Sequence, residues 1–262
     1  MFKRITLALD NYFYPGATRV WDDVRFTKLI RDKLTPDSRI LDFGAGRGKS
    51  ELLDFRKHAK HIIGADIDEG IFENPYLHEK LLISPGEALA IESDSLDLVY
   101  ACNVLEHVRD PKSFFVEVDR VLKPGGVFMA KTTNKNHYIA MVARFTPMSF
   151  HKFYNRLRGR EEVDTFPTAY RCNSKRQCQN AIRETSLAIK SIDFWEWRPE
   201  YLRISPLTYF AGILYERIVN ATKLFAPIRA VMVANLQKPL LDPKPIDSGD
   251  QNLQSSSHLA SK

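Results

Sequence analysis

Short apolar runs alternate with amphipathic stretches through the first half of the chain. Residues 20–34 carry apolar side chains at helical spacing among charged ones, and Thr35-Pro36 ends that pattern. The apolar runs SRILDF, HIIGAD, KLLIS, LDLVYAC and VFMAKTT are each short enough to be a buried strand. Strands that alternate with helical segments in this way predict an α/β fold with a doubly wound, Rossmann-like and mostly parallel sheet.

Two further helices are predicted from local signals. Residues 49–59 come directly after the first predicted strand and its glycines, and we predict a helix there. Asp110 and Pro111 supply an N-cap acid and a first-turn proline, so another helix is predicted to begin at that point. The KPGG turn ends this helix, whose buried side carries Phe114, Phe115, Val118, Val121 and Leu122.

The alternation breaks after the fifth predicted strand. Residues 134–185 are rich in aromatic and basic side chains and are predicted to form a helical insertion, or lid, over the site. LAIKSIDFWEW and AVMVANLQ complete a seven-stranded sheet whose last strand is expected to be antiparallel. We expect a single domain over residues 1–240 with a cofactor-binding core at 35–135. The polar residues 241–262 are expected to be a disordered tail.

Composition limits where the protein works and what it binds. Hydrophobic residues make up 44% and charged residues 27% of the 262 positions, which fits a globular domain with its own core. No apolar run reaches the roughly 20 residues of a spanning helix, and MFKRITLALD is no signal peptide, so a cytoplasmic protein is expected. The net charge of +6 is a mild bias toward anionic partners and no evidence for nucleic acid. Three scattered cysteines fit neither a disulfide framework nor a zinc site, and no metal site is expected.

The stretch FGAGRGKS, residues 43–50, matches two kinds of nucleotide site in part. Its end is that of a phosphate-binding loop, but such a loop needs a glycine at position 43, where this chain has Phe43. A dinucleotide fingerprint needs its third glycine one residue later than Gly48. The pattern that remains is Asp42-x-Gly44-x-Gly46-x-Gly48 at the end of a predicted strand. Glycines there let the backbone take positive φ and lie against a cofactor.

This pattern resembles motif I of the class I S-adenosylmethionine-dependent methyltransferases. The similarity covers roughly residues 35–135 and is greatest to the small-molecule, methyltransferase-11-like branch: SDSLDLVYACNVLEHVRDPKSFFVEVDRVLKPGGVF is similar to that family's fourth strand, helix and Lys-Pro-Gly-Gly turn. The resemblance implies S-adenosyl-L-methionine as the cofactor. It further implies that Gly44, Gly46 and Gly48 lie against that cofactor and that Asp42 faces its ammonium group.

The resemblance also implies the remaining cofactor contacts. Asp66 closes the second predicted strand about 20 residues after the glycines, where an acid takes the ribose hydroxyls, with Ile67 against the adenine. Asn103 follows the fourth strand and is either level with the methionine portion or a helix cap. The family often carries an Asp after the third strand for the adenine amino group. This chain has Pro85 near that place, and Glu87 or backbone amides beside it are expected to substitute.

Several residues are candidates for the catalytic base. Methyl transfer to a hydroxyl needs a base, whereas it needs no covalent intermediate and no metal. His107 in LEHV stands where the small-molecule branch commonly has a histidine, and it is either that base or a residue that packs the loop. The predicted insertion offers further candidates at His137, Tyr138, His151 and Tyr170.

The acceptor is indicated by the last part of the chain. Residues 144–160 interleave basic and aromatic side chains, and residues 201–236 are strongly apolar with spaced basic residues. The second segment is either core or a surface that rests on a membrane, which would make the cytoplasmic protein peripheral. DTFPTAYRCNS resembles bacterial methyltransferases associated with surface-glycan assembly. The sequence therefore predicts methyl transfer to a small-molecule, lipid-linked or glycan acceptor, with oxygen as the expected atom. The alternatives are an RNA methyltransferase and a non-catalytic S-adenosylmethionine-binding module.

Overall fold

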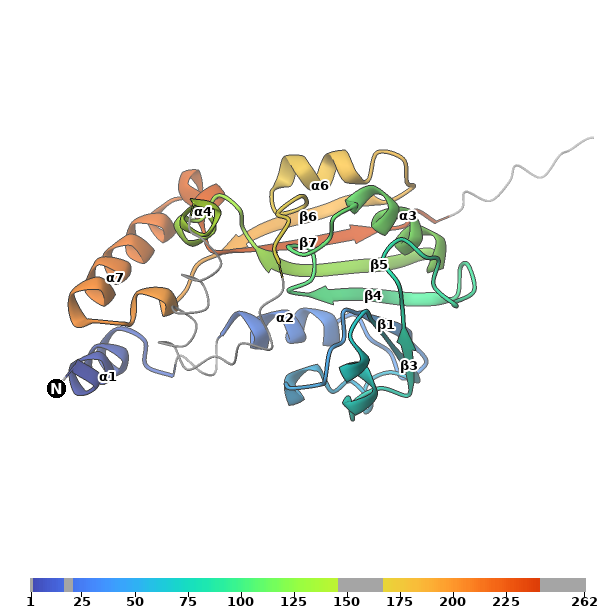
Figure 1. Cartoon of the computed structure of the whole chain (residues 1–262), viewed down its shortest axis with the longest axis horizontal. Coiled ribbons are helices and arrows are strands. Elements are labelled where there is room, and N and C mark those ends of the chain that lie inside the picture. The colour runs from blue at the N-terminus through green and yellow to red at the C-terminus, as the bar shows by residue number, and fades with distance from the viewer. Residues whose placement is uncertain (1, 17–20, 146–166, 241–262) are drawn as a thin grey trace, which may run out of the picture.

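A seven-stranded sheet with the order β3-β2-β1-β4-β5-β7-β6 forms the centre of the computed structural model (Figure 1). The structure describes residues 2–16, 21–145 and 167–240. Neighbouring strands are parallel from β3 through β5, and β7 is antiparallel to both of its neighbours. The predicted doubly wound sheet with an antiparallel last strand is confirmed. The strands are β1 (Arg39–Phe43), β2 (His61–Asp66), β3 (Glu79–Leu82), β4 (Leu96–Cys102), β5 (Leu122–Thr133), β6 (Ala188–Trp195) and β7 (Val231–Gln237).

The helices cover both faces of this sheet and one of its ends. They are α1 (Phe2–Phe13), α2 (Asp22–Arg31), α3 (Pro111–Val121), α4 (Tyr138–Phe145), α6 (Lys175–Ala181) and α7 (Pro206–Ala221). Short 3-10 turns are η2 (Glu51–Leu53), η3 (Glu69–Glu73), η5 (Glu200–Leu202) and η6 (Lys223–Ile228). Among the residues that the structure describes, no helix is both long and apolar enough to cross a membrane.

Two buried clusters separate the faces of the sheet because successive side chains of a strand point to opposite sides. Leu41 of β1 packs in the cluster that includes α3 and α6, whereas its neighbour Ile40 packs in the cluster that includes α2. A third, smaller cluster joins α1 to α7 through Tyr14, Tyr209 and Ile213. The central strands are therefore buried on both faces, and the strand ends remain as the place for a site.

The predicted helix over residues 49–59 is wrong. The turn η2 and a second turn at residues 56–58 form there instead, and Asp54 between them has extended backbone, with φ −77° and ψ 99°. The Asp54 carboxylate accepts from the backbone N–H of Arg56 at 3.1 Å and also binds that arginine's side chain. Such local bonds compete with helical hydrogen bonding. Phe55, fully buried between α2 and the sheet, fixes this path.

The other local predictions compare with the structure as follows. Asp110 caps α3 as predicted, accepting from the backbone N–H groups of Lys112 and Ser113. Leu122, expected on that helix, is the first residue of β5, which begins before the KPGG turn. Within residues 134–185 the described part contains α4 and α6, as expected of a helical insertion. His151, most of residues 144–160 and the predicted tail at 241–262 lie outside the described residues.

Candidate functional site

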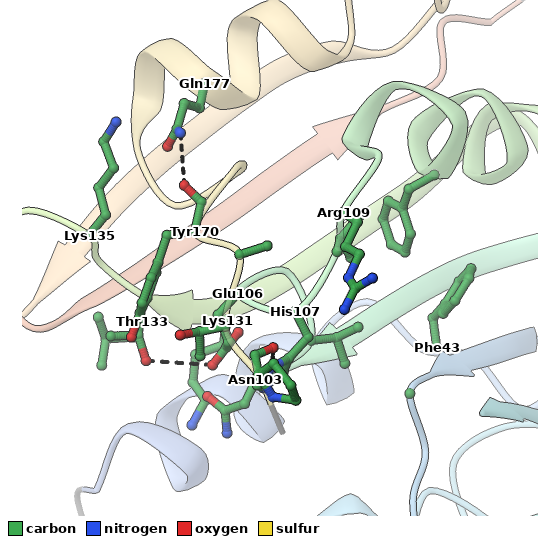
Figure 2. A pocket seen from close by; sticks show the side chains of 18 of the residues that line it. Phe43, Asn103, Glu106, His107, Arg109, Lys131, Thr133, Lys135, Tyr170 and Gln177 are labelled. Atoms are coloured by element: carbon green, nitrogen blue, oxygen red, sulfur yellow. Dashed lines mark hydrogen bonds between the residues drawn. The ribbon is translucent and has the colours of Figure 1, made fainter. Parts of the chain in front are cut away.

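A cavity of about 2120 Å³ lies at the carboxyl ends of the strands. The strand order reverses between β1 and β4, and open α/β sheets bind ligands at this switch point because the loops after the two strands diverge there. Residues from the ends of β1, β2, β4, β5 and β6 line the cavity, together with the segment 167–170. Figure 2 shows its central part around Asn103, Glu106 and His107.

The glycine turn after β1 forms one wall. Gly44, Gly46 and Gly48 have φ of 82°, 53° and 69°, a region that favours residues without Cβ. A Cβ on Gly44 would stand 2.3 Å from a methyl carbon of Val104, and a Cβ on Gly48 would stand 2.4 Å from Oδ1 of Asn74. A Cβ on Gly46 would meet no atom within 4 Å. Gly46 therefore faces open space where a ligand has room to lie.

Asn74 holds this glycine turn in place, a role that the sequence did not reveal. Its Nδ2 donates to the carbonyl oxygens of Ala45 at 3.1 Å and Gly46 at 3.2 Å, while its Oδ1 accepts from the backbone N–H of Tyr76 at 3.0 Å. The residue is 2% exposed. The sequence signal at this place is an Asn-Pro pair, which predicts a turn but does not indicate which distant residues Asn74 contacts.

Asp42 lies beneath the turn, in the end of β1. It is buried, and the hydroxyl of Tyr100 bonds to its carboxylate. Burial raises the pKa of Asp42 from its ordinary value of 3.8 to about 7, since the charged form loses hydration, and the charge of Asp66 raises it further. The Tyr100 bond acts in the opposite direction. Asp42 is therefore a carboxylate for which a neighbouring positive charge would be favourable.

Asp66 connects the end of β2 to the glycine turn. Its Oδ2 accepts from the backbone N–H of Gly46 at 2.8 Å, and its Oδ1 accepts from that of Asp68 at 2.9 Å. Each carboxylate oxygen keeps further acceptor capacity for a hydroxyl donor. Ile67 is 56% exposed at the cavity, an unusual position for so apolar a side chain, and Glu87 is exposed on the same rim.

The turn after β4 brings Asn103 to the floor of the cavity. Asn103 has φ of 58°, uncommon for a residue other than glycine, and its backbone N–H donates to the carbonyl of Lys131 at 2.7 Å. A turn follows it and α3 begins later, at Pro111, so Asn103 is not the cap of a helix. Strained backbone of this kind persists where surrounding structure fixes it, often at functional sites.

His107 is held in one orientation by the segment that lies over the turn. Its Nδ1 is 3.0 Å from the carbonyl oxygen of Pro167. A carbonyl oxygen only accepts, so Nδ1 carries the proton, and in the neutral ring the lone pair is on Nε2. The carbonyl of Glu106 accepts from the N–H groups of Ala169 and Tyr170, which fixes the same segment over the turn.

Glu106 itself points toward β5 rather than to a metal. Its buried carboxylate accepts from the hydroxyl of Thr132 at 2.5 Å. It also accepts from the hydroxyl of Thr133 at 3.5 Å (Figure 2). Among the described residues, no group of three or more His, Cys, Asp or Glu side chains is placed to hold a metal ion. Glu106 thus orients the His107 turn through its bonds to β5.

Lys131 of β5 ties α2 to the sheet beside the site. Its side chain is 2% exposed and forms ion pairs with Asp22, at 2.7 Å, and with Asp23, both in the first turn of α2. Burial alone would lower the pKa of Lys131, but the neighbouring Cys102 and the two aspartates raise it above its ordinary value. Lys131 therefore stays charged, and its ion pairs fix the start of α2 at the cavity.

Three of the other candidate bases also lie at this cavity. His137 is 2% exposed, and its Nε2 is 3.4 Å from Oε2 of Glu196. The rings of His137 and Tyr138 are in contact, with 4.1 Å between centroids. Tyr170 lies over the turn after β4, and burial raises its pKa. The fold thus brings His137, Tyr138 and Tyr170 to the cavity that His107 lines.

These residues fit the cofactor that the glycine pattern implies. The Cβ direction of Gly46 is open, Asp42 lies beneath the turn, and Asp66 and Ile67 stand at the neighbouring strand end. An adenosine with an amino-acid tail has an ammonium group, ribose hydroxyls and an adenine ring. The Asp42 carboxylate matches the ammonium group, the Asp66 carboxylate matches the ribose hydroxyls, and the apolar side chain of Ile67 matches the adenine ring.

Residues 41–130 match the family model described as a methyltransferase domain. The ubiquinone biosynthesis O-methyltransferase of Dinoroseobacter shibae is 35% identical over 105 residues, covering 37% of this chain and 42% of that protein. A probable S-adenosylmethionine-dependent methyltransferase of Mycolicibacterium smegmatis is 30% identical over 149 residues, covering 55% of this chain and 54% of its own length. This chain therefore spans about half the length of the curated relatives that it matches.

Among solved structures, the cyclase SpnF is similar with a TM-score of 0.52 and 16% identity, covering 82% of this chain and 80% of that one. At this identity the likeness shows the fold alone, and one fold carries several reactions. The family match is more specific, because residues 41–130 contain the glycine turn, Asp66 and His107.

Proposed function

We propose that this chain, a member of the class I S-adenosylmethionine-dependent methyltransferases, transfers the methyl group of S-adenosyl-L-methionine to an oxygen of a small-molecule acceptor. One observation carries the proposal: the positive-φ glycine turn leaves Gly46 open to the cavity between the ends of β1 and β2. The name of the Dinoroseobacter shibae relative, an O-methyltransferase, supports oxygen as the acceptor atom. We infer that this acceptor is a free small molecule, a lipid-linked molecule or a glycan.

The cofactor roles follow from the chemistry of the strand ends. Gly44, Gly46 and Gly48 give the cofactor backbone to lie against, and Asp42 faces its ammonium group. Asp66 accepts from the ribose hydroxyls, and its existing bond to the Gly46 N–H keeps the carboxylate pointed at the turn. Ile67 and Glu87 border the adenine, and Asn103 borders the methionine portion.

His107 is the base in this proposal. The bound cofactor supplies an electrophilic methyl group on a sulfonium, and the protein aligns the acceptor with it, an effect worth up to about 7–11 kcal/mol. The Pro167 carbonyl accepts a hydrogen bond from the Nδ1 proton, so Nε2 is the atom that takes the acceptor's hydroxyl proton as the new O–C bond forms and the methyl–sulfur bond breaks. Glu106 positions this turn through Thr132 and Thr133.

Methyl transfer can be tested before the acceptor is known. The chain is incubated with S-adenosylmethionine that carries a labelled methyl group and with extract of its source organism, separated into lipid, glycan, other small-molecule and RNA fractions. We expect label in one of the first three fractions. Label in the RNA fraction would show that the chain is a nucleic-acid methyltransferase and would overturn this proposal. If the chain binds the cofactor but no fraction is labelled, the chain would be a non-catalytic binding module.

Replacement of His107 by alanine tests the base. We expect the rate of methyl transfer to fall roughly 10²–10⁴-fold while the dissociation constant of S-adenosylhomocysteine stays the same, because a base acts on the acceptor and not on the cofactor. His61→Ala is the control, since His61 stands at the opposite end of β2. A His107→Ala protein that melts earlier yet transfers methyl groups at the normal rate would show that His107 only packs the loop.

A further inference from the structure

The outward side of α7 is apolar. Four large side chains recur along it at spacings of three or four residues, so they lie on one side of the helix. They are Leu207, Phe210, Leu214 and Ile218, whose side chains are 81%, 55%, 56% and 48% exposed. We call these four residues the outer stripe of α7.

The inward side of the same helix is buried as well. Tyr209, Ile213 and Val219 pack into the molecule, and so does Glu216. A helix at the surface of a soluble protein normally places polar residues outward, whereas one that is apolar on all sides is covered on all sides. Contiguous exposed apolar side chains of this size mark an interaction site.

The apolar surface continues beyond the helix. Leu224 and Phe225 of η6 are 78% and 38% exposed, and η6 packs against the end of α7. On α1, which packs beside α7 at the same end of the molecule (Figure 1), Ile5 is 39% and Tyr12 is 80% exposed. Residues from three elements therefore contribute to one apolar end of the molecule.

The charges around this surface have one sign. Across the described residues of α1, α7 and η6, the exposed charged side chains are basic: Arg4, Arg217 and Lys223. The acidic side chains of these elements, Asp10 and Glu216, are buried and bound within the molecule, the first to Arg203 and Tyr209 and the second to Tyr14. An occupant of this surface would meet apolar and positive groups and no exposed carboxylate from these elements.

We propose that this end of the molecule docks on an anionic membrane surface. The outer stripe of α7 enters the acyl boundary, and Arg4, Arg217 and Lys223 lie near lipid phosphates. A second copy of the chain is the less suitable occupant, because a symmetric contact would bring the same basic residues of both copies together without opposing acids. An anionic surface satisfies both the apolar and the positive groups.

Docking in this way would place the cavity beside the membrane. Gly212 of α7 lies so close to Pro199 and Leu202 that a Cβ on it would be 2.7 Å from Pro199 Cβ. Pro199, Glu200 and Tyr201 in turn line the cavity. The acceptor would then be a lipid-linked molecule that enters from the bilayer. This consequence rests on the proposed methyl transfer, whereas membrane docking does not.

Flotation with vesicles tests the docking without any enzyme assay. The full chain is mixed at low salt with vesicles of phosphatidylcholine and 30 mole per cent phosphatidylglycerol, on the order expected of an anionic membrane. We expect the wild type to float. Phe210→Gln should bind roughly tenfold or more weakly, because the variant lacks the aromatic ring whose removal from water stabilises binding. Phe72→Gln is the matched control, since Phe72 is 56% exposed on η3, away from this end.

The charge component has its own pair of variants. Lys223→Gln should weaken binding about fivefold, whereas Lys175→Gln on α6 should not, and high salt should weaken binding of the wild type. Absence of the wild type from the floating fraction, or equal flotation of Phe210→Gln and Phe72→Gln, would overturn the proposal. A dimer in sedimentation that Phe210→Gln disrupts would assign the surface to a second copy instead. Because cofactor binding is measured separately, failure here leaves the proposed methyl transfer standing.

Discussion

Asp42 shows how a single residue can serve the site at a cost to the fold. Its carboxylate is 4% exposed beneath the glycine turn, and burial raises its pKa to about 7. In the unfolded chain the pKa returns to about 3.8. The folded state therefore binds a proton that the unfolded state has lost over the interval between these values. The stabilisation is full below pH 3.8 and disappears as the pH rises through 7.

Asp42→Asn should remove this pH dependence. The neutral amide does not have to ionise inside the core, so the variant should be more stable than the wild type at pH 8, and its melting temperature should change less between pH 5 and 8. Thermal unfolding of both proteins without cofactor across that range measures the difference. Parallel curves for the two proteins would show that Asp42 does not titrate in this window.

The same carboxylate should make cofactor binding depend on pH. The ionised form attracts an ammonium group and the protonated form does not, so the affinity for S-adenosylhomocysteine should fall as the pH drops below 7. In Asp42→Asn the affinity should be low at every pH, including pH 8 where the variant is most stable relative to the wild type. Calorimetry at pH 5.5 and pH 8 provides both values, and equal affinity of the wild type at the two would contradict the role of Asp42.

At the scale of elements, the site depends on a contact between two turns. The side chain of Asn74 bonds the backbone of the glycine turn, so η3 and the turn after β1 form one unit. The glycine turn contains no helix or strand of its own. The position of Gly46 relative to Asp66 is therefore set by a buried amide as well as by the sheet.

Asn74→Ala should loosen that unit. Two carbonyls lose their donor in a partly buried place, which costs roughly 1–3 kcal/mol of unfolding free energy. The affinity for S-adenosylhomocysteine should also fall, because the turn is no longer held in position. Asn11→Ala, at an exposed position of α1, is the control. A variant that is less stable but binds the cofactor normally at 25 °C would show that Asn74 serves the fold alone.

Elements were predictable from the sequence where the signal was local. All seven strands and the Asp110 cap were predicted because apolar runs and capping residues act within a few positions. The helix predicted at 49–59 does not form, because the bond from the Arg56 N–H to the Asp54 carboxylate and the burial of Phe55 override helical propensity there. Asn74 was missed because its partners lie 28 and 29 residues away.

At the scale of the whole molecule, the sequence left one segment ambiguous for a physical reason. Residues 201–236 were expected to be either core or a membrane-facing surface, and the structure divides them. β7 and the inward side of α7 belong to the core, whereas the outer stripe of α7 is exposed. The apolar content of a segment gives the amount of apolar surface, whereas tertiary packing determines which side of the helix is buried. Burial of the central strands on both faces leaves the strand ends and the loops after them as the shared position of the candidate site residues that the structure describes.

Calorimetric titration with S-adenosylhomocysteine tests the central claim most directly. It compares the wild type with Gly46→Val, whose side chain would occupy the open space at the glycine turn, and with Gly16→Val. Gly16 has φ of 72° and equally open surroundings, but it lies outside the cavity, so both valines carry a similar backbone strain of about 1–2 kcal/mol. We predict one binding site in the wild type and in Gly16→Val, and none in Gly46→Val. Normal binding by Gly46→Val, or a wild type that binds magnesium ATP and not S-adenosylhomocysteine, would contradict the account.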